Sequence, residues 1–333
     1  MQDNIAILIN KINKKKGNLI SIIMPLFNEE QSLPFVLKEL FDYLPVSLPQ
    51  YNFEITFIDD CSTDRSYSIV KDTSKSTPAN IKLSIVQLSK NSGSHVAITA
   101  GINISRGDFT IIMSSDGQDP AEVVALLIKE WENDNELVLA SRADNLDQGI
   151  VSKTLSRYAW KLMNWSTNID MPETGCDVLG MDKIVVDAFN KMDERNTTFI
   201  FRILSLGFKK KEIQYIKRAR VGGISKWTFL KKIAIIFDAI TGFSNRPLKL
   251  ITGLGLFVFV ILVFRWIFVV FNVYILDKKP TELTIILNTF FTALAVQVLI
   301  LGVIGDYIWR ILDETRKRPV YEIRKVDGDI FEN

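Results

Sequence analysis

Four short apolar runs, each closed by a polar cluster, constrain the fold of this chain more than any other feature. The runs are rich in β-branched residues, and they cover residues 19–27, 53–60, 82–89 and 108–115. A stretch with helical character follows each run. Continuous apolar strands that alternate with helices are typical of a parallel sheet covered on both faces. The sequence therefore predicts an α/β fold with helices on both faces of a mostly parallel sheet.

The region after these runs is less regular. Residues 136–142 are predicted to form another strand, and residues 153–168 are predicted to form a helix. Residues 171–183 are expected to contain a loop that returns toward the edge of the sheet.

The polar clusters all fall where a predicted strand ends, which is where ligands bind in sheets of this kind. The clusters are Asn28 with Glu29, Asp59 with Asp60, Asn91 with Gly93, and Asp116 with Gln118. Any one cluster, such as the residues after Cys61, has an alternative role in starting the next helix. Because all four clusters occupy the same position at the end of a strand, helix capping alone does not explain them well. All four can line one pocket.

Two of these clusters point to specific chemistry. Asp116 and Gln118 can direct two oxygen ligands at one hard cation, and magnesium leaves its other positions to phosphates and water. The alternative for this motif is an ordinary polar turn. Asp59 and Asp60 are suited to accept hydrogen bonds from a nucleobase or a ribose hydroxyl.

Two long apolar runs at 251–276 and 283–305 each exceed the roughly 20 residues needed to cross a bilayer. They predict two transmembrane helices, and a buried helical hairpin in a soluble core is the alternative. Arg265 lies inside the first run, where packing against the second helix or helix association is favoured over a functional role. Hairpins of this kind are expected to pack with copies of themselves, so a homo-oligomer is expected.

Basic residues on the outer flanks of these runs set the orientation. Four basic residues precede the first run, namely Lys231, Lys232, Arg246 and Lys249, and four follow the second run, namely Arg310, Arg316, Lys317 and Arg318. The connection between the runs is charge-balanced. By the positive-inside rule, the large N-terminal domain and both termini are predicted to be cytoplasmic. No signal peptide is recognised, and Cys61 and Cys176 suit a reducing compartment.

A basic segment lies just before the first apolar run. Residues 209–232 carry nine Lys or Arg and one acidic residue, although the net charge of the whole chain is only +2. Within it, Gly222, Gly223, Ser225 and Lys226 can clamp a phosphate, with a solvated basic loop as the alternative. Its position favours lipid headgroups or a phosphate ligand over nucleic acid, and a soluble nucleic-acid binder leaves the apolar runs unexplained.

The motifs also follow one another in a familiar order: FNE after the first strand, then IDDCSTD, LSKNSG, SSDGQDP, GCDVLGMDK, ERN and GGISKWTF. In this order the chain resembles family 2 glycosyltransferases with the GT-A fold. More narrowly, it resembles bacterial polyprenyl-phosphate glycosyltransferases related to dolichol-phosphate mannose and glucose synthases. The resemblance covers residues 18–325, including the two-span hairpin.

The resemblance implies roles for matching positions. Nucleotide binding is implied for Pro25, Phe27, Asn28, Glu29, Asp59, Asp60, Asn91, Gly93 and Ser115. Metal and diphosphate binding is implied for Asp116 and Gln118. Acceptor phosphate binding is implied for Arg142, Arg220, Ser225 and Lys226. Catalytic roles are implied for Asp116 and Asp177, the latter positioning the acceptor or taking its residual proton.

Three residues bear on this assignment. Ser114 replaces the first aspartate of the family's metal motif, and Cys61 replaces a glycine that usually follows the paired aspartates. Ser114 puts the nucleotide contact at that position in doubt, and Cys61 argues for a slightly different turn. His95 is the only histidine in the chain, and a structural role is favoured for it over that of a catalytic base.

The implied reaction is the inverting transfer of one sugar from a nucleotide-diphosphate sugar, with UDP-sugars considered first, to a polyprenyl (undecaprenyl-type) phosphate. It takes place at the cytoplasmic face of the membrane with Mg²⁺ or Mn²⁺, and makes a lipid-linked sugar for cell-envelope glycans. One alternative is a catalytically inactive membrane scaffold. The other is a polysaccharide synthase, which needs more spans for a polymer channel.

The expected organisation along the chain follows from these assignments. It consists of an amphipathic segment at 1–17, a catalytic domain at 18–228, interfacial helices at 229–247, a transmembrane hairpin at 248–312 and a tail at 313–333.

Overall fold

A computed structural model describes residues 17–143, 176–192, 198–218, 281–316 and 319–328, and the single residues Phe257, Phe264 and Ile267. Two compact units are present, one formed by 1–232 with 319–333 and the other by 233–318. The predicted helix at 153–168 and the interfacial helices at 229–247 lie outside the described residues, as does the N-terminal segment apart from Gly17.

The first unit is built on one sheet, which has eight strands among the described residues and the order β7-β5-β6-β4-β1-β2-β3-β8. The five predicted strands are present as β1 Leu19–Leu26, β2 Asn52–Asp59, β3 Ile81–Leu88, β4 Phe109–Ile112 and β5 Leu137–Arg142. The other three are β6 Val178–Asp182, β7 Lys210–Tyr215 and β8 Ile323–Asp327. Strands β4, β1, β2 and β3 are parallel to their neighbours in this group, and β5 is parallel to β7. The predicted mixed, mostly parallel sheet is therefore confirmed.

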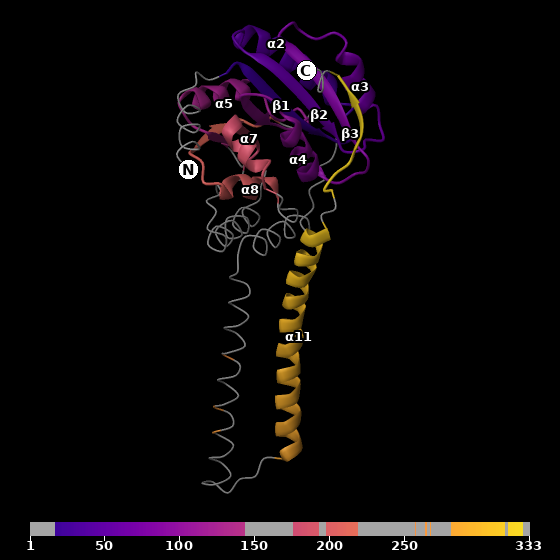
Figure 1. Cartoon of the computed structure of the whole chain (residues 1–333), viewed down its shortest axis with the longest axis vertical. Coiled ribbons are helices and arrows are strands. Elements are labelled where there is room, and N and C mark those ends of the chain that lie inside the picture. Colours follow the sequence, from indigo (N-terminus) through magenta and orange to yellow (C-terminus); the bar gives the residue numbers. More distant parts are fainter. Residues whose placement is uncertain are drawn as a thin grey trace. The chain divides into compact units, whose positions relative to one another are not determined.

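Helices cover both faces of this sheet (Figure 1). They are α2 Leu33–Ser47, α3 Ser66–Thr73, α4 Ser94–Ile104, α5 Glu122–Glu132, α7 Lys183–Phe189 and α8 Phe199–Ser205. Alternate strand residues face opposite layers: Ile22 belongs to the core under α2, α3 and α5, whereas Ile23 faces α4. At Gly101 of α4 an added Cβ would lie 2.1 Å from Ile23 Cγ2, so a larger residue would push α4 away from β1.

Strand β6 enters the sheet between β4 and β5 and is antiparallel to both. The sequence predicts a loop near this part of the chain, but residues 178–182 lie inside the sheet as a buried strand. A β-carbon on Gly180 would lie 2.3 Å from Phe109 Cζ, so the lack of a side chain lets β6 pair closely with β4. Because β6 runs antiparallel, the residues before it lie at the edge where β4 and β5 end.

The C-terminal part of the first unit adds β8 antiparallel to β3, with Val326 opposite Val86. Tyr67 of α3 donates a hydrogen bond to Asp327, and Lys71 Nζ lies 3.0 Å from Asp327 Oδ1. Tyr321, just before β8, accepts a hydrogen bond from Asn103 Nδ2 at 3.0 Å. Residues 323–327, which the sequence assigns to a tail, thus extend the sheet of the first unit.

In the second unit the structure describes one long helix, α11, which covers Glu282–Arg316 over 35 residues. Many of its large apolar side chains are exposed, including Leu283, Ile286, Phe290, Leu301, Ile308 and Ile311. Over the described part of the chain, no helix reaches the length and apolar character needed to cross a membrane. The two predicted spans are therefore not confirmed, and most of the first one lies outside the described residues.

Candidate active site

The loops after β1 and β2 are joined by hydrogen bonds. The Asn28 backbone N–H donates to Ser62 Oγ at 3.0 Å, and Asn28 Oδ1 accepts from the Thr63 N–H at 2.9 Å. Glu29 N–H donates to Ser66 Oγ at 2.8 Å. Asn28 and Cys61 both have positive φ angles, 53° and 64°, a conformation that side chains other than Gly, Asn and Asp rarely adopt. A glycine, which the family resemblance implies at this position, would adopt this positive φ without strain, whereas Cys61 adopts it at some conformational cost.

The paired aspartates are buried, and their carboxylates hold neighbouring loops. Asp59 accepts hydrogen bonds from Ser62 N–H at 3.0 Å and from Gln87 Nε2 at 2.8 Å. Asp60 accepts from the N–H groups of Ser92 and Gly93, each at 2.7 Å, and so fixes the start of α4. Burial raises the pKa of Asp60 above its ordinary value, although these two N–H groups favour the ionised form.

The remaining predicted nucleotide-binding residues lie at the same end of the sheet. Ser115 Oγ donates to the Pro25 carbonyl at 2.7 Å, which links the ends of β4 and β1. Asn91 is exposed, and Gly93 has a positive φ of 91° just before α4. The carboxylate oxygens of Asp59 and Asp60 order these loops. A role of the same oxygens in binding a nucleotide stays a prediction.

The loop 114–119 is organised around two carboxylates. Ser114 Oγ lies 2.7 Å from Asp116 Oδ1 and 2.6 Å from Asp119 Oδ2, and its single proton is donated to one of them at a time. The Gln118 N–H donates to Asp116 Oδ1 at 3.1 Å, and Gly117 between them has a φ of 75°. The motif is therefore both a tight turn and a carboxylate cluster, so the two alternatives for it are not exclusive.

Asp116 and Gln118 supply carboxylate and amide oxygens, which suit a hard divalent cation that keeps other positions for phosphate and water. Gln118 Nε2 donates to the Arg218 carbonyl at 3.4 Å, and this contact leaves the amide oxygen as the atom for a cation. Asp119 is fully committed to protein contacts. Within the described ranges, no group of three or more His, Cys, Asp or Glu residues is placed to hold a metal. A metal here would rely on the donor for the rest of its ligands.

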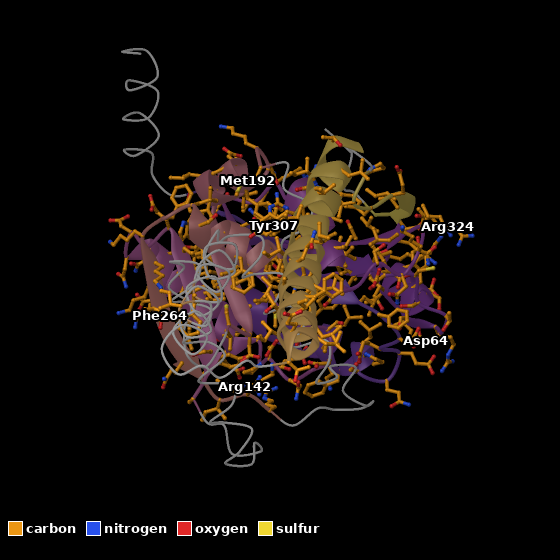
Figure 2. The ribbon with its side chains drawn as sticks, turned by 90° about the horizontal axis from the view of Figure 1, so that it is seen from below. Asp64, Arg142, Met192, Phe264, Tyr307 and Arg324 are labelled. Atoms are coloured by element: carbon orange, nitrogen blue, oxygen red, sulfur yellow. The ribbon has the colours of Figure 1, made fainter. Side chains whose placement is uncertain are left out.

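A second cluster forms where β5, β6 and β7 meet. Register pairs Ala140 with Val178 and Arg142 with Tyr215. Asp177, which precedes β6, therefore lies beside Arg142 at the end of β5, and Arg142 is labelled in Figure 2. Arg142 Nε and Nη2 lie 3.2 and 3.1 Å from the two oxygens of Asp177, in bidentate geometry.

Lys217 completes this cluster from the end of β7. Its Nζ donates to Asp177 Oδ1 at 2.8 Å and lies 3.5 Å from Asp119 Oδ1. Tyr215 OH donates to the same Asp119 oxygen at 2.5 Å. Burial lowers the pKa of Lys217, but Asp119 and Asp177 outweigh it and raise the pKa above its ordinary value. Lys217 is therefore a fixed cation that connects Asp177 with Asp119 of the loop 114–119.

The structure brings together most of the predicted residues but adds others. Arg142, predicted for the acceptor phosphate, is paired with Asp177, and Arg220, Ser225 and Lys226 lie outside the described residues. Sequence reasoning missed Lys217, Asp119, Tyr215 and Gln87. The only signals for them were the basic segment that contains Lys217 and the position of Asp119 directly after Gln118.

His95 is the second residue of α4 and packs against Phe199. Its ring centroid is 5.5 Å from that of Phe199, and burial lowers the pKa of His95 to about 4. A neutral histidine packed on an aromatic ring supports the structural role favoured from the sequence.

Comparison with known proteins identifies the family of this chain. The family model described as "Glycosyl transferase family 2" matches residues 21–180. "Uncharacterized glycosyltransferase YkcC" of Bacillus subtilis is 32% identical over 92% of this chain and 94% of that protein. "Prophage bactoprenol glucosyl transferase homolog" of Escherichia coli is 32% identical over 92% of this chain and 99% of its own length.

Other similarities extend this picture. "Undecaprenyl-phosphate 4-deoxy-4-formamido-L-arabinose transferase" of Photorhabdus laumondii is 30% identical over 93% of this chain and 94% of that protein. Among solved structures, mannosyl-3-phosphoglycerate synthase from Rubrobacter xylanophilus covers 67% of this chain and 72% of its own, with 12% identity and a TM-score of 0.47. That structural similarity is too low to add to the argument. The full-length sequence similarities show that this chain belongs to glycosyl transferase family 2 and is a glycosyltransferase.

Proposed function

We propose that this enzyme transfers one sugar from a nucleotide-diphosphate sugar, with UDP-sugars tested first, to a polyprenyl phosphate. The names of relatives that align over nearly their whole length support polyprenyl phosphate as the acceptor. The observation that carries the proposal is the contact between two clusters at one sheet edge. The loop 114–119 offers oxygen ligands for a diphosphate-bound cation. Lys217 contacts both Asp119 of this loop and Asp177 of the second cluster.

On the donor side, Asp116 and Gln118 are the residues that would hold a divalent cation. When bound, Mg²⁺ or Mn²⁺ supplies positive charge against the leaving diphosphate. The chain itself orders the surrounding loops: Asp60 fixes the residues before α4, and Asn28 ties the β1 and β2 loops together. A nucleotide in this place would meet loops that are already held in position.

On the acceptor side, Arg142 and Lys217 supply fixed positive charge. A phosphate monoester is already largely ionised near neutral pH, so its oxygen needs little help from a base to attack the sugar. Attack from the face opposite the leaving diphosphate inverts the anomeric carbon. This course requires donor and acceptor phosphates to lie on opposite sides of the sugar, and the loop 114–119 and the Arg142 cluster offer two separate places for them.

We also propose that the reaction takes place at the cytoplasmic face of a membrane, with residues 248–312 as a two-span hairpin that packs with copies of itself. The exposed apolar side chains along α11 support contact with lipid, because soluble proteins rarely expose such extensive apolar surface. The basic segment at 209–232 supports the orientation, since anionic lipids attract such segments.

The test is transfer of label into lipid. Membranes that contain the full chain are incubated with polyprenyl phosphate and a panel of labelled nucleotide sugars, and label is measured in the organic extract. We expect one donor to label the lipid, and we expect Asp116→Ala to reduce the rate at least about 100-fold through loss of charge stabilisation. No labelled lipid from any donor contradicts the proposal, and a water-soluble polymer would indicate a polysaccharide synthase instead.

The matched control for this variant is Asp72→Ala. Asp72 is an exposed carboxylate on α3 that pairs with Lys75. Its removal deletes the same charge from the same unit and should leave the transfer rate unchanged.

A further inference from the structure

Lys217 is the cation that contacts both clusters, the loop 114–119 and the cluster around Asp177. It follows β7, and only 15% of its side chain is exposed. A buried ammonium is costly unless it is paired, and here Asp177 and Asp119 provide the pairing from two different elements. The position of the ammonium is thus set by carboxylates on both sides, unlike that of a freely moving surface lysine.

Arg142 and Lys217 converge on the same carboxylate. Arg142 contacts both oxygens of Asp177, and Lys217 contacts one of them. A carboxylate that accepts hydrogen bonds from two cations has both of its oxygens engaged in holding them. It is well suited to hold the planar guanidinium and the ammonium so that both face one place.

Both cations keep donor capacity in this arrangement. An ammonium has three N–H donors and a guanidinium has five. Lys217 donates to Asp177, while its 3.5 Å distance from Asp119 is at the limit of a hydrogen bond. Arg142 uses Nε and Nη2 on Asp177. Paired Arg and Lys donors of this kind are typical of phosphate-binding sites.

We propose that Lys217 binds the phosphate monoester of the acceptor together with Arg142, and that Asp177 and Asp119 are positioning residues that orient these cations. This inference rests on the proposed function. The acceptor is favoured over the donor diphosphate because Asp119 lies between Lys217 and Asp116 in the chain of contacts. In that chain of contacts Asp119 and Ser114 separate the ammonium from Asp116, one of the proposed donor ligands.

The test compares Lys217→Gln with Lys211→Gln. Lys211 is an exposed residue of β7 in the same basic segment, so its loss removes the same charge from that segment. In the full-length protein in detergent, KM is measured separately for polyprenyl phosphate and for the nucleotide sugar. Loss of one charged hydrogen bond predicts about a 10- to 100-fold rise in the lipid KM of Lys217→Gln. The nucleotide-sugar KM and both constants of Lys211→Gln should not change.

The same experiment has outcomes that overturn the inference. An unchanged lipid KM in Lys217→Gln refutes it, and a rise confined to the nucleotide-sugar KM places Lys217 on the donor diphosphate. Lys217→Arg keeps the charge and should recover most of the lipid affinity. A failure to recover it in a folded protein also counts against a phosphate contact.

Two further measurements separate binding from folding and from transfer. Equilibrium binding of polyprenyl phosphate without donor, below the unfolding temperature of each variant, should be weakened in Lys217→Gln and not in Lys211→Gln. This binding measurement tests the role of Lys217 even if no donor supports transfer. A lack of transfer would contradict only the proposed function.

For Asp177→Asn we expect a raised lipid KM with the pH dependence of kcat unchanged. Loss of a titrating limb from that profile would make Asp177 a base and refute its positioning role.

Discussion

Polar side chains at the strand ends mostly contact other parts of the protein. These contacts offer a physical reason for the serine at position 114. The family resemblance implies an aspartate at the position of Ser114, and the Ser114 hydroxyl lies within hydrogen-bonding distance of Asp116 and Asp119. An aspartate at this position would place a third carboxylate between these two, and like charges at such distances repel. Ser114 therefore joins the two carboxylates where an aspartate would repel both.

His95 leads to a prediction about stability. Its folded pKa of about 4 lies below the ordinary value near 6.5, so the unfolded chain binds the extra proton between these two pH values. The contribution of neutral His95 is fully present above pH 6.5 and is lost as the pH falls toward 4. We expect the free energy of unfolding to decrease between pH 7 and pH 5 by about 2 kcal/mol through His95 alone.

The measurement is urea unfolding of the full-length protein in detergent at the two pH values, for wild type and His95→Phe. Phenylalanine keeps a ring against Phe199 but does not titrate. The wild type should lose more stability on acidification than the variant does. Equal losses would show that His95 does not control this pH dependence.

Among the secondary-structure elements, the sequence predicts the continuous apolar strands, including the four-residue β4, but it misses the buried β6 and the polar, exposed β7 and β8. Residues 19–27 and 53–60 are predicted as strands and appear as β1 and β2 within one residue at each end. Strand β7, KKEIQY, is largely exposed at one edge of the sheet, and β8 is exposed at the other. Edge strands often carry charged side chains such as Lys, so their sequences lack the continuous apolar pattern of a buried strand.

Strand β8 depends on a side-chain contact that can be tested. Asp327→Ala removes the acceptor for Tyr67 OH and the partner of Lys71, both on α3. We expect a loss of about 1 kcal/mol in stability, with faster amide hydrogen exchange in β3 and β8. Exchange in β1 should be unaffected.

Arg324→Ala is the matched control, since Arg324 is an exposed residue of the same strand and is labelled in Figure 2. Its exchange pattern should remain that of the wild type. If both variants open the edge equally, the contact between Asp327 and α3 does not hold β8 in place.

For the whole molecule, the proposed hairpin predicts how the chain is released from membranes. A hairpin inserted into the hydrocarbon resists both high salt and alkaline carbonate, because its attachment is not electrostatic. We expect the full chain to remain in the membrane pellet after both treatments, as detected by immunoblot. Release by high salt would indicate attachment only through basic residues such as those at 209–232, and would contradict the two-span proposal.

The class of sheet and the family could both be predicted from the sequence alone, and the sequence also predicts the end of the sheet at which the site lies. These depend on local patterns, since apolar runs specify buried strands and parallel strands place their carboxyl ends at one edge. The tertiary structure decided which residues share a cluster. Asp177 and Lys217 are 40 residues apart and meet only because β6 is antiparallel between β4 and β5 and β7 pairs with β5. Strand order and direction depend on contacts between distant segments, and no local pattern in the sequence encodes them.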